Sequence, residues 1–448
     1  MTVLRFDKVV PVALQTLDSW FNGRRVETTL VRDAFGMLTV VLPDDAIADT
    51  NSWNELAARL HTALSVYSPK ISQVLLRASD LIDPSDVIAS PDRVRLPDTP
   101  DTWLVDRLQT NQDWLRVPLT FDPPLPTAVA YSIKGGVGRT TTFALWAWYL
   151  ARQGKNIVLV DLDLEAPGVA GLLLDKDRLP DYGLVDWLVE ALVGQADEEL
   201  LRESLVECDL ARDEPGRIRV LPAFGRKTGE YVSKLGRIYM PTFASATGQF
   251  LGLAERFAML LGQLAGLPDR PDAVLLDARA GLHDIGSAAV TRLGAEVFLF
   301  VRDDNQTWQA YGQLFGHLRQ SRNVALGMAD NDLRWRLKMV GAQLEPTESA
   351  RRRLLDSCYN LWTELYDDES AIDEESPGPQ PIPQIFGRDD ASAPHFPFSI
   401  QFDPRVRSLD LIDPDERPDW NLIETAFGEF FFEATGRLFP DKAEQGEA

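Results

Sequence analysis

The residues best suited to chemistry form a glycine-rich run, which reads Lys134, Gly135, Gly136, Val137, Gly138, Arg139, Thr140 and Thr141. Glycines let the backbone turn tightly and point its N–H groups inward, and a helix after such a turn presents its positive end to an anion. A hydroxyl at Thr140 is suited to ligate Mg²⁺ between two phosphates. The run therefore predicts a loop that binds the phosphates of a nucleotide.

Two apolar runs downstream of this loop end on aspartates. Residues 156–162 include Asp161 and lead into Asp163, and residues 273–276 lead into Asp277. A carboxylate at the end of a buried strand is unfavourable unless it faces a cation, polar groups or water. An aspartate in this position is also the usual Mg²⁺ holder of P-loop proteins. We therefore predict a magnesium site formed by Thr140, Asp161 and Asp277.

The three motifs, in this order, resemble those of the ParA/MinD family of deviant Walker-A P-loop ATPases (SIMIBI class), over residues 127–439. The resemblance implies ATP and Mg²⁺ as ligands and a nucleotide-dependent homodimer. It makes Lys134 the signature lysine that reaches the partner's nucleotide and Asp163 the aspartate that orients the attacking water. It also makes Thr140 the magnesium threonine and Asp277 the Walker-B aspartate. Lys134 and Asp163 are thus the expected catalytic residues.

Arg139 departs from that pattern, because the family usually has a lysine here that reaches the β- and γ-phosphates. Arginine keeps the charge but replaces a compact ammonium with a planar fork, so the fit around the phosphates must change. Only nine of the 45 basic residues are lysines, so a general drift toward arginine explains the change as well as a tuned, slowed hydrolysis does.

Two functions stay open at this point. One is a slowly hydrolysing, ATP-driven dimerisation switch that acts on an unidentified partner protein. The other is a nucleotide-binding scaffold or regulatory subunit with negligible hydrolysis, in a multi-protein bacterial system such as a defence apparatus. A bacterial tyrosine kinase shares these motifs, but such enzymes carry a C-terminal tyrosine cluster, and the last tyrosine here is Tyr366.

Two residues beyond Asp277 also carry chemistry. Arg279 could sense a γ-phosphate or form a salt bridge with a neighbouring carboxylate, the more common use of arginine. His283 follows the same strand and could belong to a switch segment. The other three histidines show no metal-ligand spacing, and we expect them to be structural or at the surface.

The elements that must position these residues alternate between short apolar runs and helix-length segments. The apolar runs cover residues 128–133, 156–162, 218–222, 273–276, 296–301, 337–342 and 398–402. Strands separated by helices, such as one over 140–152, predict a doubly wound, mostly parallel α/β sheet with nucleotide at the carboxyl ends of the strands. A last helix over 419–439 is expected to pack on the sheet.

The remaining segments give the domain organisation. A strand pair over 25–31 and 37–42 and a helix over 53–67 indicate a smaller N-terminal α+β domain, residues 1–120, of unknown role. The P-loop ATPase domain then covers residues 121–448 and includes an acidic, proline-rich loop or insertion over 367–394.

Composition limits the partners. The 448 residues carry a formal net charge of −23, which supports neither non-specific DNA binding nor attachment to an anionic membrane. The two cysteines, Cys208 and Cys358, form no CxxC pair, so neither a disulfide framework nor an iron–sulfur site is indicated, and both are expected to be buried. The sequence contains no signal-peptide pattern and no run of roughly 18 apolar residues, so a cytoplasmic location is the expectation.

Overall fold

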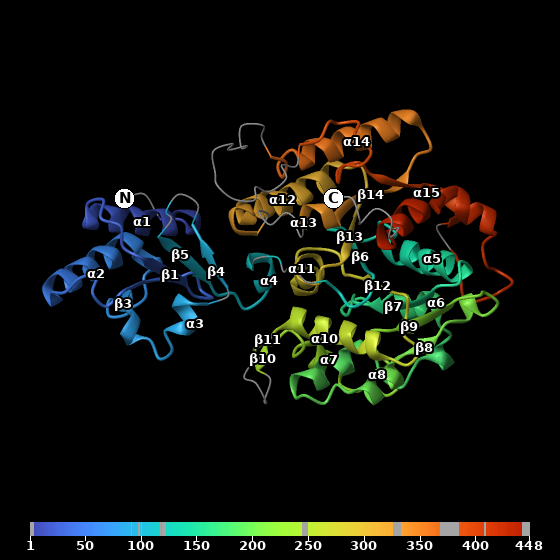
Figure 1. Ribbon diagram of the computed structural model, residues 1–448, viewed down its shortest axis with the longest axis horizontal. Helices are drawn as coiled ribbons and strands as arrows, with labels where there is room; N and C mark the ends of the chain where they lie inside the picture. Colours follow the sequence, from blue (N-terminus) through green and yellow to red (C-terminus); the bar gives the residue numbers. More distant parts are fainter. Residues whose placement is uncertain are drawn as a thin grey trace. The chain divides into compact units, whose positions relative to one another are not determined.

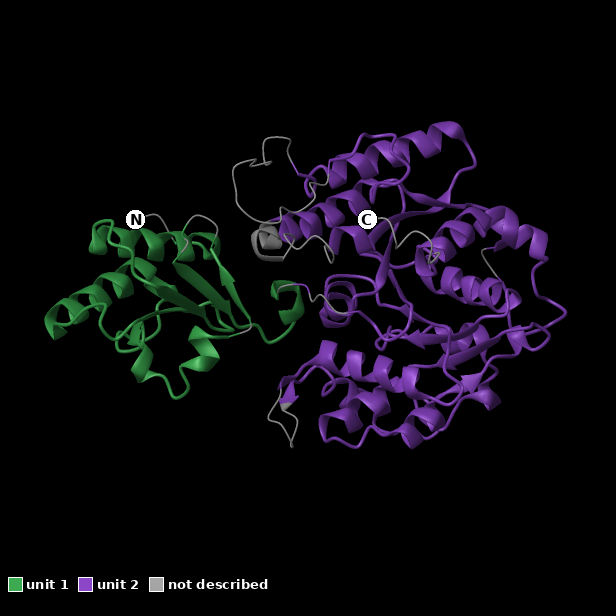
Figure 2. Cartoon of the chain, in the orientation of Figure 1, with its two compact units in different colours: residues 1–117, 323–325 green, residues 118–322, 326–448 purple. Residues whose placement is uncertain are grey.

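A computed structural model gives the fold (Figure 1). It describes residues 4–90, 92–96, 99, 101–116, 118, 122–243, 250–325, 333–367, 385–406 and 409–440. The chain divides into two compact units, residues 1–117 with 323–325 and residues 118–322 with 326–448 (Figure 2). Most of the acidic segment expected over 367–394 lies outside the described residues. Within the described part of the chain, no helix is long and apolar enough to cross a membrane.

The first unit is built on a five-stranded sheet with the order β3-β2-β1-β5-β4. Strands β1 and β2 form the expected antiparallel hairpin, and β5 runs parallel to β1. Helix α2 starts earlier than the predicted 53–67, because the Asp49 carboxylate accepts hydrogen bonds from two backbone amides of its first turn. Helices and strands of this unit are α1 (Val9–Phe21), β1 (Thr28–Arg32), β2 (Leu38–Leu42), α2 (Thr50–Leu64), β3 (Leu75–Arg77), α3 (Ser85–Ile88), β4 (Arg93–Arg95), β5 (Thr102–Asp106) and α4 (Gln112–Leu115).

The second unit contains an eight-stranded sheet with the order β15-β14-β13-β6-β12-β7-β9-β8. Its neighbours are all parallel except β8, which pairs antiparallel with β9 at the edge. The doubly wound, mostly parallel α/β fold is therefore confirmed. The strands are β6 (Thr127–Tyr131), β7 (Asn156–Asp161), β8 (Val206–Glu207), β9 (Arg217–Leu221), β12 (Ala273–Asp277), β13 (Glu296–Val301), β14 (Leu337–Leu344) and β15 (Phe398–Gln401).

Helices connect these strands, and a separate two-stranded pair lies outside the main sheet. The pair is β10 (Thr242–Phe243) with β11 (Phe250–Leu251). The helices are α5 (Arg139–Arg152), α6 (Val169–Leu173), α7 (Leu184–Leu192), α8 (Glu198–Ser204), α9 (Tyr231–Leu235), α10 (Leu253–Gly266), α11 (Asp284–Thr291), α12 (Asn305–Ala325), α13 (Leu333–Arg336), α14 (Glu348–Trp362) and α15 (Trp420–Leu438).

The strand order reverses at β6. From β6 the chain moves to β7 and β9 on one side, then returns through β12 and adds β13, β14 and β15 on the other side. In open α/β sheets, ligands bind beyond the carboxyl ends of the strands at such a reversal. The loop that follows β6 is the glycine-rich run.

Helix α5 is held against the sheet by an aromatic cluster. The rings of Trp146, Phe298 and Phe430 contact one another edge to face, with centroids 5.5–5.6 Å apart. Each of the three side chains is fully buried, and each comes from a different element: α5, β13 and α15. The helix that begins at the glycine-rich loop is thus fixed by packing along its length.

Candidate functional site

The glycine-rich loop links β6 to α5 and leaves room beside its backbone. Gly136 and Gly138 have φ angles of 74° and 89°, a left-handed conformation that favours glycine. A Cβ atom added to Gly135, Gly136 or Gly138 would meet no atom of the described residues within 4 Å. Packing does not require these glycines. The backbone conformation favours glycine at Gly136 and Gly138, and the free space beside the loop would let an anion approach.

The structure brings Thr140 and Asp277 together. The Thr140 hydroxyl donates to Asp277 Oδ2 at 2.5 Å, and Oδ1 of the same buried carboxylate has no hydrogen-bond partner among the described residues. Burial raises the pKa of Asp277 from its ordinary 3.8 to about 6. A hydroxyl and a carboxylate oxygen without a partner are oxygen ligands of the kind Mg²⁺ takes, so the residues fit this ion.

Asp161 lies next to Asp277, because the two residues pair in register on β7 and β12. Its Oδ1 accepts from the amide of Asp163, and its Oδ2 accepts from the amides of Gly168 and Val169, each at 3.1 Å. Burial, and then the neighbouring Asp277 carboxylate, raise the pKa of Asp161 to about 8. Since both oxygens hold the loop after β7, its role as a metal ligand stays a prediction.

Asp163 lies in that loop. Its Oδ1 accepts from the amide of Ala166 at 3.1 Å and lies 4.0 Å from Arg279 Nε. Burial raises the pKa of Asp163, while the positive charges of Arg139 and Arg279 oppose this shift. The predicted water-orienting aspartate is therefore under the influence of two arginine charges.

Arg139 does not extend toward open solvent. Its guanidinium is buried, and Nη1 donates to the carbonyl oxygen of Ala278 at 2.6 Å. Ala278 directly follows Asp277, so Arg139 ties the start of α5 to the end of β12. Sequence reasoning predicted a phosphate contact for this residue and gave no signal for the carbonyl.

Lys134 contacts residues of its own chain. Its ammonium group hydrogen-bonds the side-chain oxygen of Gln306 and lies 3.7 Å from Asp304 Oδ1. Both partners lie at the start of α12, after β13. The residue predicted to be the signature lysine is therefore held by its own chain, on the edge where β6 and β13 end.

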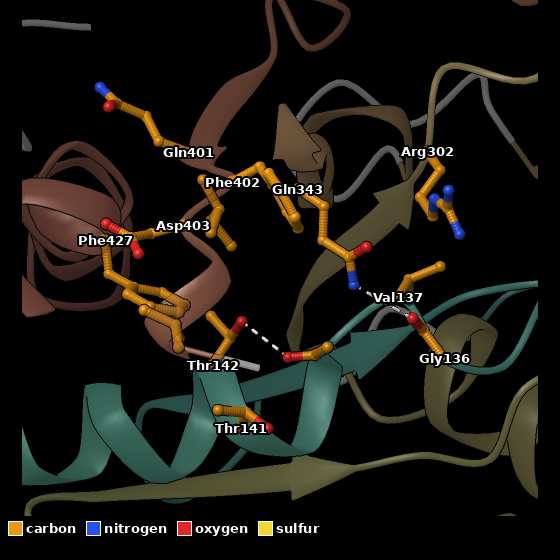
Figure 3. A pocket seen from close by; sticks show the side chains of 13 residues that line it. Gly136, Val137, Thr141, Thr142, Arg302, Gln343, Gln401, Phe402, Asp403 and Phe427 are labelled. Carbon is orange, nitrogen blue, oxygen red and sulfur yellow. Dashed lines mark hydrogen bonds between the residues drawn. The ribbon is translucent and has the colours of Figure 1, made fainter. Parts of the chain in front are cut away.

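A pocket of about 310 Å³ adjoins the loop (Figure 3). The residues that line it are Gly136, Val137, Gly138, Thr141, Thr142, Arg302, Gln343, Ile400, Gln401, Phe402, Asp403, Val406 and Phe427. Gln343 spans from β14 to the loop and donates to the carbonyl oxygen of Gly136 at 3.2 Å. The volume lies in the range of small-molecule sites. Sequence analysis did not find Gln343 or Arg302, which the fold brings to the same pocket as the loop.

A second charged cluster lies beside Asp163. Arg279 Nη1 contacts Glu165 Oε1 at 3.1 Å, which confirms the expected salt bridge with a neighbouring carboxylate. The Tyr239 hydroxyl also donates to Glu165 Oε1. His283 caps α11, and burial lowers its pKa. Sequence reasoning found Arg279 and His283 but missed Tyr239, which is far away along the chain.

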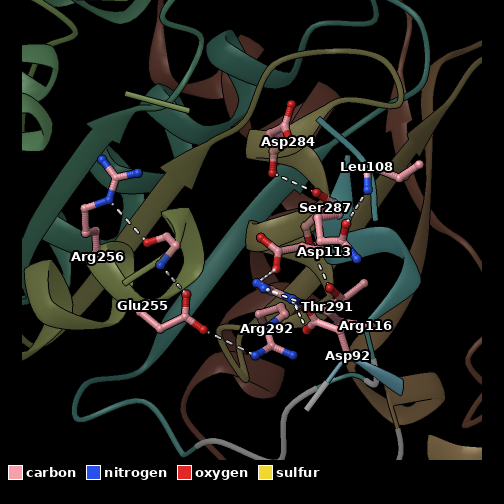
Figure 4. A network of polar contacts seen from close by, with 12 residues as sticks. Asp92, Leu108, Asp113, Arg116, Glu255, Arg256, Asp284, Ser287, Thr291 and Arg292 are labelled. Atoms are coloured by element: carbon pink, nitrogen blue, oxygen red, sulfur yellow. Dashed lines mark hydrogen bonds and ion pairs between the residues drawn. The ribbon is translucent and has the colours of Figure 1, made fainter. Parts of the chain in front are cut away.

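The segment that carries Tyr239 is anchored by Arg256. This buried guanidinium donates to the carbonyl oxygens of Gly252, Leu188, Ile238 and Met240. Figure 4 shows Arg256 with a dashed line for one of its hydrogen bonds. Because four carbonyl groups converge on one rigid fork, the backbone around Tyr239 is fixed.

One of the other histidines and both cysteines are buried. His395 is buried, with its ring nitrogens bonded to the Tyr366 hydroxyl and the Arg388 carbonyl oxygen, so it is structural. Cys208 and Cys358 are both free and buried, as expected.

Similarity to known proteins identifies the second unit. Residues 128–357, just over half of the chain, match the family model described as CobQ/CobB/MinD/ParA nucleotide binding domain. A 64-residue stretch is 44% identical to the chromosome-partitioning ATPase Soj of Thermus thermophilus and covers 14% of this chain and 26% of that protein.

Solved structures resemble the chain over a larger share of its length. The structure of pNOB8 ParA bound to nonspecific DNA aligns over 71% of this chain and all of its own, at 18% identity and a TM-score of 0.39. Cobyrinic acid a,c-diamide synthase from Mycobacterium smegmatis aligns over 60% of this chain and 91% of its own, at 21% identity and a TM-score of 0.33. Because the family model matches more than half of its length, the chain belongs to the CobQ/CobB/MinD/ParA family of nucleotide-binding proteins.

Proposed function

We propose that this protein is a Mg²⁺-dependent ATPase that works as a dimerisation switch of the ParA/MinD kind and acts on a partner protein. The observation that carries the proposal is the contact between Thr140 and Asp277, with Asp277 Oδ1 left without a partner among the described residues, beside the phosphate loop. A magnesium ion held there would neutralise charge on the β- and γ-phosphates.

The loop from Lys134 to Thr141 binds the phosphates, and the 310 Å³ pocket beside it takes the nucleoside. Thr140 and Asp277, with Asp161 next to them, hold the metal ion. Asp163 orients the attacking water, and although burial raises its pKa, the charges of two arginines oppose that shift.

Lys134 is the proposed link between nucleotide and assembly. Its ammonium group is held at the rim by Gln306 and a partly exposed aspartate, contacts that are weak enough to exchange. On dimerisation, the ammonium group would leave these partners and neutralise a phosphate bound by the second copy. A cation supplied in trans would make association depend on the nucleotide.

A second candidate function is a nucleotide-binding scaffold or regulatory subunit without appreciable hydrolysis. The position of Arg139 favours it, because a guanidinium bonded to the Ala278 carbonyl oxygen is less available to a phosphate than a lysine would be. Binding would then rest on the loop amides and the metal ion, and hydrolysis would be slow or absent.

Three variants separate the two candidates. Asp163→Ala should abolish phosphate release and keep ATP binding, which traps the ATP-induced dimer. Lys134→Ala should keep ATP binding by the monomer and lose the dimer. Arg139→Lys should raise the rate of phosphate release if the guanidinium limits hydrolysis.

These variants and the wild type are compared by light scattering with ATP and by phosphate release. A monomer under every nucleotide condition, with no release from the wild type or from Arg139→Lys, would exclude the switch and support the scaffold.

A further inference from the structure

Arg279 occupies a position between the two halves of the nucleotide site. It follows β12, the strand between β6, which leads into the phosphate loop, and β7, which leads to Asp163. The amide of Ala278 donates to the Ala130 carbonyl oxygen at 3.1 Å, and the amide of Gly281 donates to the Ser132 carbonyl oxygen at 2.9 Å. The backbone on both sides of Arg279 is thereby bonded to the end of β6 and the start of the loop.

The side chain of Arg279 is less tightly held than its backbone. Its exposed fraction is 38%, and its closest carboxylate oxygen is Glu165 Oε1 at 3.1 Å. Asp163 Oδ1 lies farther away, at 4.0 Å. The ion pair is half-buried, with 24% of the Glu165 side chain exposed, and a more highly charged anion nearby can compete with Glu165 for the guanidinium.

The two carboxylate oxygens of Glu165 differ in their hydrogen bonds. Its Oε1 accepts from Arg279 and from the Tyr239 hydroxyl, whereas its buried Oε2 has no hydrogen-bond partner in the described part of the chain. If Arg279 left, Tyr239 would still bind the carboxylate. The cluster therefore keeps one partner for Glu165 in either position of the arginine.

The other arginine near Asp163 is committed elsewhere. Arg139 is buried and bonded to the carbonyl oxygen of Ala278, the residue next to Arg279. A terminal phosphate bound between the loop and Asp163 would therefore meet Arg279 as the more mobile guanidinium. A guanidinium fork binds phosphate through two parallel hydrogen bonds, which are stronger than a single contact to a carboxylate.

We propose that Arg279 exchanges its ion pair with Glu165 for the γ-phosphate of bound ATP, and that this exchange makes the protein bind ATP more tightly than ADP. The inference rests on the proposed function, since it concerns the same nucleotide site. It adds a sensor within one chain, separate from the lysine that acts across the dimer. The exchange also removes the positive charge of Arg279 from Glu165. The surroundings of the Tyr239 hydroxyl, which binds the same carboxylate, would therefore differ between the ATP-bound and ADP-bound states.

The test measures the affinity of a non-hydrolysable ATP analogue and of ADP, both with Mg²⁺, by calorimetry. For Arg279→Gln, the affinity for the ATP analogue should fall about tenfold or more, because a charge-assisted contact is lost, while the ADP affinity stays within about twofold. Arg279→Lys should keep part of the preference for ATP. Glu165→Gln should strengthen binding of the ATP analogue only, because it removes the competing carboxylate.

Arg152→Gln is the matched control. Arg152 has the same exposed fraction, 38%, and also pairs with a glutamate, Glu214, but it lies at the far end of α5. This variant should bind both nucleotides as the wild type does. The inference would be overturned if Arg279→Gln left the ratio of the two affinities unchanged, whether both affinities stayed the same or both fell equally. A wild type that binds neither nucleotide would instead overturn the proposed function.

Discussion

At the scale of single residues, the site depends on carboxylates that the fold keeps away from water. Asp277 is buried and shares one oxygen with the Thr140 hydroxyl, while Asp161 uses both oxygens to bind backbone amides. Burial raises the pKa of both carboxyls. A bound divalent cation would reverse this effect, because it favours the ionised form.

The first residue-scale prediction concerns Thr140. Thr140→Ala should weaken Mg²⁺-dependent ATP binding by about tenfold or more, the range that even outer-shell partners of metal ligands reach. Thr140→Ser keeps the hydroxyl and should bind nearly as the wild type does. The measurement is an ATP titration with Mg²⁺ and with a chelator. Equal affinities with and without Mg²⁺ in the wild type would contradict the site assignment.

The second prediction concerns pH. The folded-state pKa of Asp277, about 6, lies above its ordinary value of 3.8, so below about pH 6 a proton competes with the cation. Mg²⁺-dependent ATP affinity should therefore rise between pH 5 and pH 7. Asp277→Asn is the control, because it loses the contribution of Asp277 and keeps those of Asp161 and of the nucleotide's own phosphates. An affinity that falls over this range would count against Asp277 as a ligand.

The raised pKa values of Asp277 and Asp161 also determine how the stability of the nucleotide-free protein changes with pH. A carboxyl with a raised folded-state pKa stabilises the fold below its unfolded pKa, and this contribution is lost as the pH rises through the folded value. For Asp277 and Asp161 the window runs from about 4 to about 8. These two groups thus lower the unfolding free energy over that window, and Mg²⁺ with ATP would restore it.

At the scale of elements, helix α5 connects the packed core to the glycine-rich loop. Its first turn follows Gly138, and its middle packs against β13 and α15 through Trp146, Phe298 and Phe430. The closing helix α15 is therefore part of what positions the site, although it contributes only Phe427 to the pocket lining.

The packing of α15 on the core can be tested by comparing two of its phenylalanines. Phe430 is fully buried, whereas Phe432, two positions later on α15, has an exposed fraction of 72%. Phe430→Ala should lower the unfolding free energy by about 3–5 kcal/mol, and Phe432→Ala by less than about 1 kcal/mol. Denaturant unfolding checks both values. Similar losses for the two variants would show that α15 does not pack as described.

The elements were largely predictable because buried parallel strands appear in a sequence as short apolar runs. The run over 156–162 became β7, Asn156–Asp161, and the helix expected over 140–152 became α5. The two-residue edge strand β8 was missed, since so short a strand leaves no periodic signal.

Within the site, the residue types and their order were predictable, but their partners were not. The contact of Arg139 with Ala278 joins residues 139 positions apart, and that of Glu165 with Tyr239 joins residues 74 positions apart. No local pattern encodes such pairs. Gln343 was equally hidden, because it reaches Gly136 only after β14 has been placed in the sheet.

At the scale of the whole molecule, the two units have separate cores. The core of the first unit comes from α1, α2 and its five-stranded sheet, as in Leu30, Leu56 and Val40. The loop, the carboxylates and the pocket described above all belong to the second unit. The second unit therefore supplies every residue assigned to the nucleotide site.

The net charge of −23 gives the last prediction, because added salt should act in opposite directions on the proposed dimerisation and on any binding to DNA. Two copies of an acidic chain repel each other at long range, and salt screens this repulsion with a Debye length of about 10 Å at 0.1 M. Binding to duplex DNA instead weakens as salt rises, since it depends on the release of counterions from phosphates.

With a non-hydrolysable ATP analogue, dimerisation should therefore be stronger at about 150 mM than at about 20 mM NaCl. Binding to a random duplex should stay weak at the higher salt concentration. Sedimentation velocity over a salt series measures the first, and fluorescence anisotropy of a labelled duplex measures the second. Tight duplex binding at the higher concentration that falls steeply with added salt would reveal a basic surface strong enough to override the net charge.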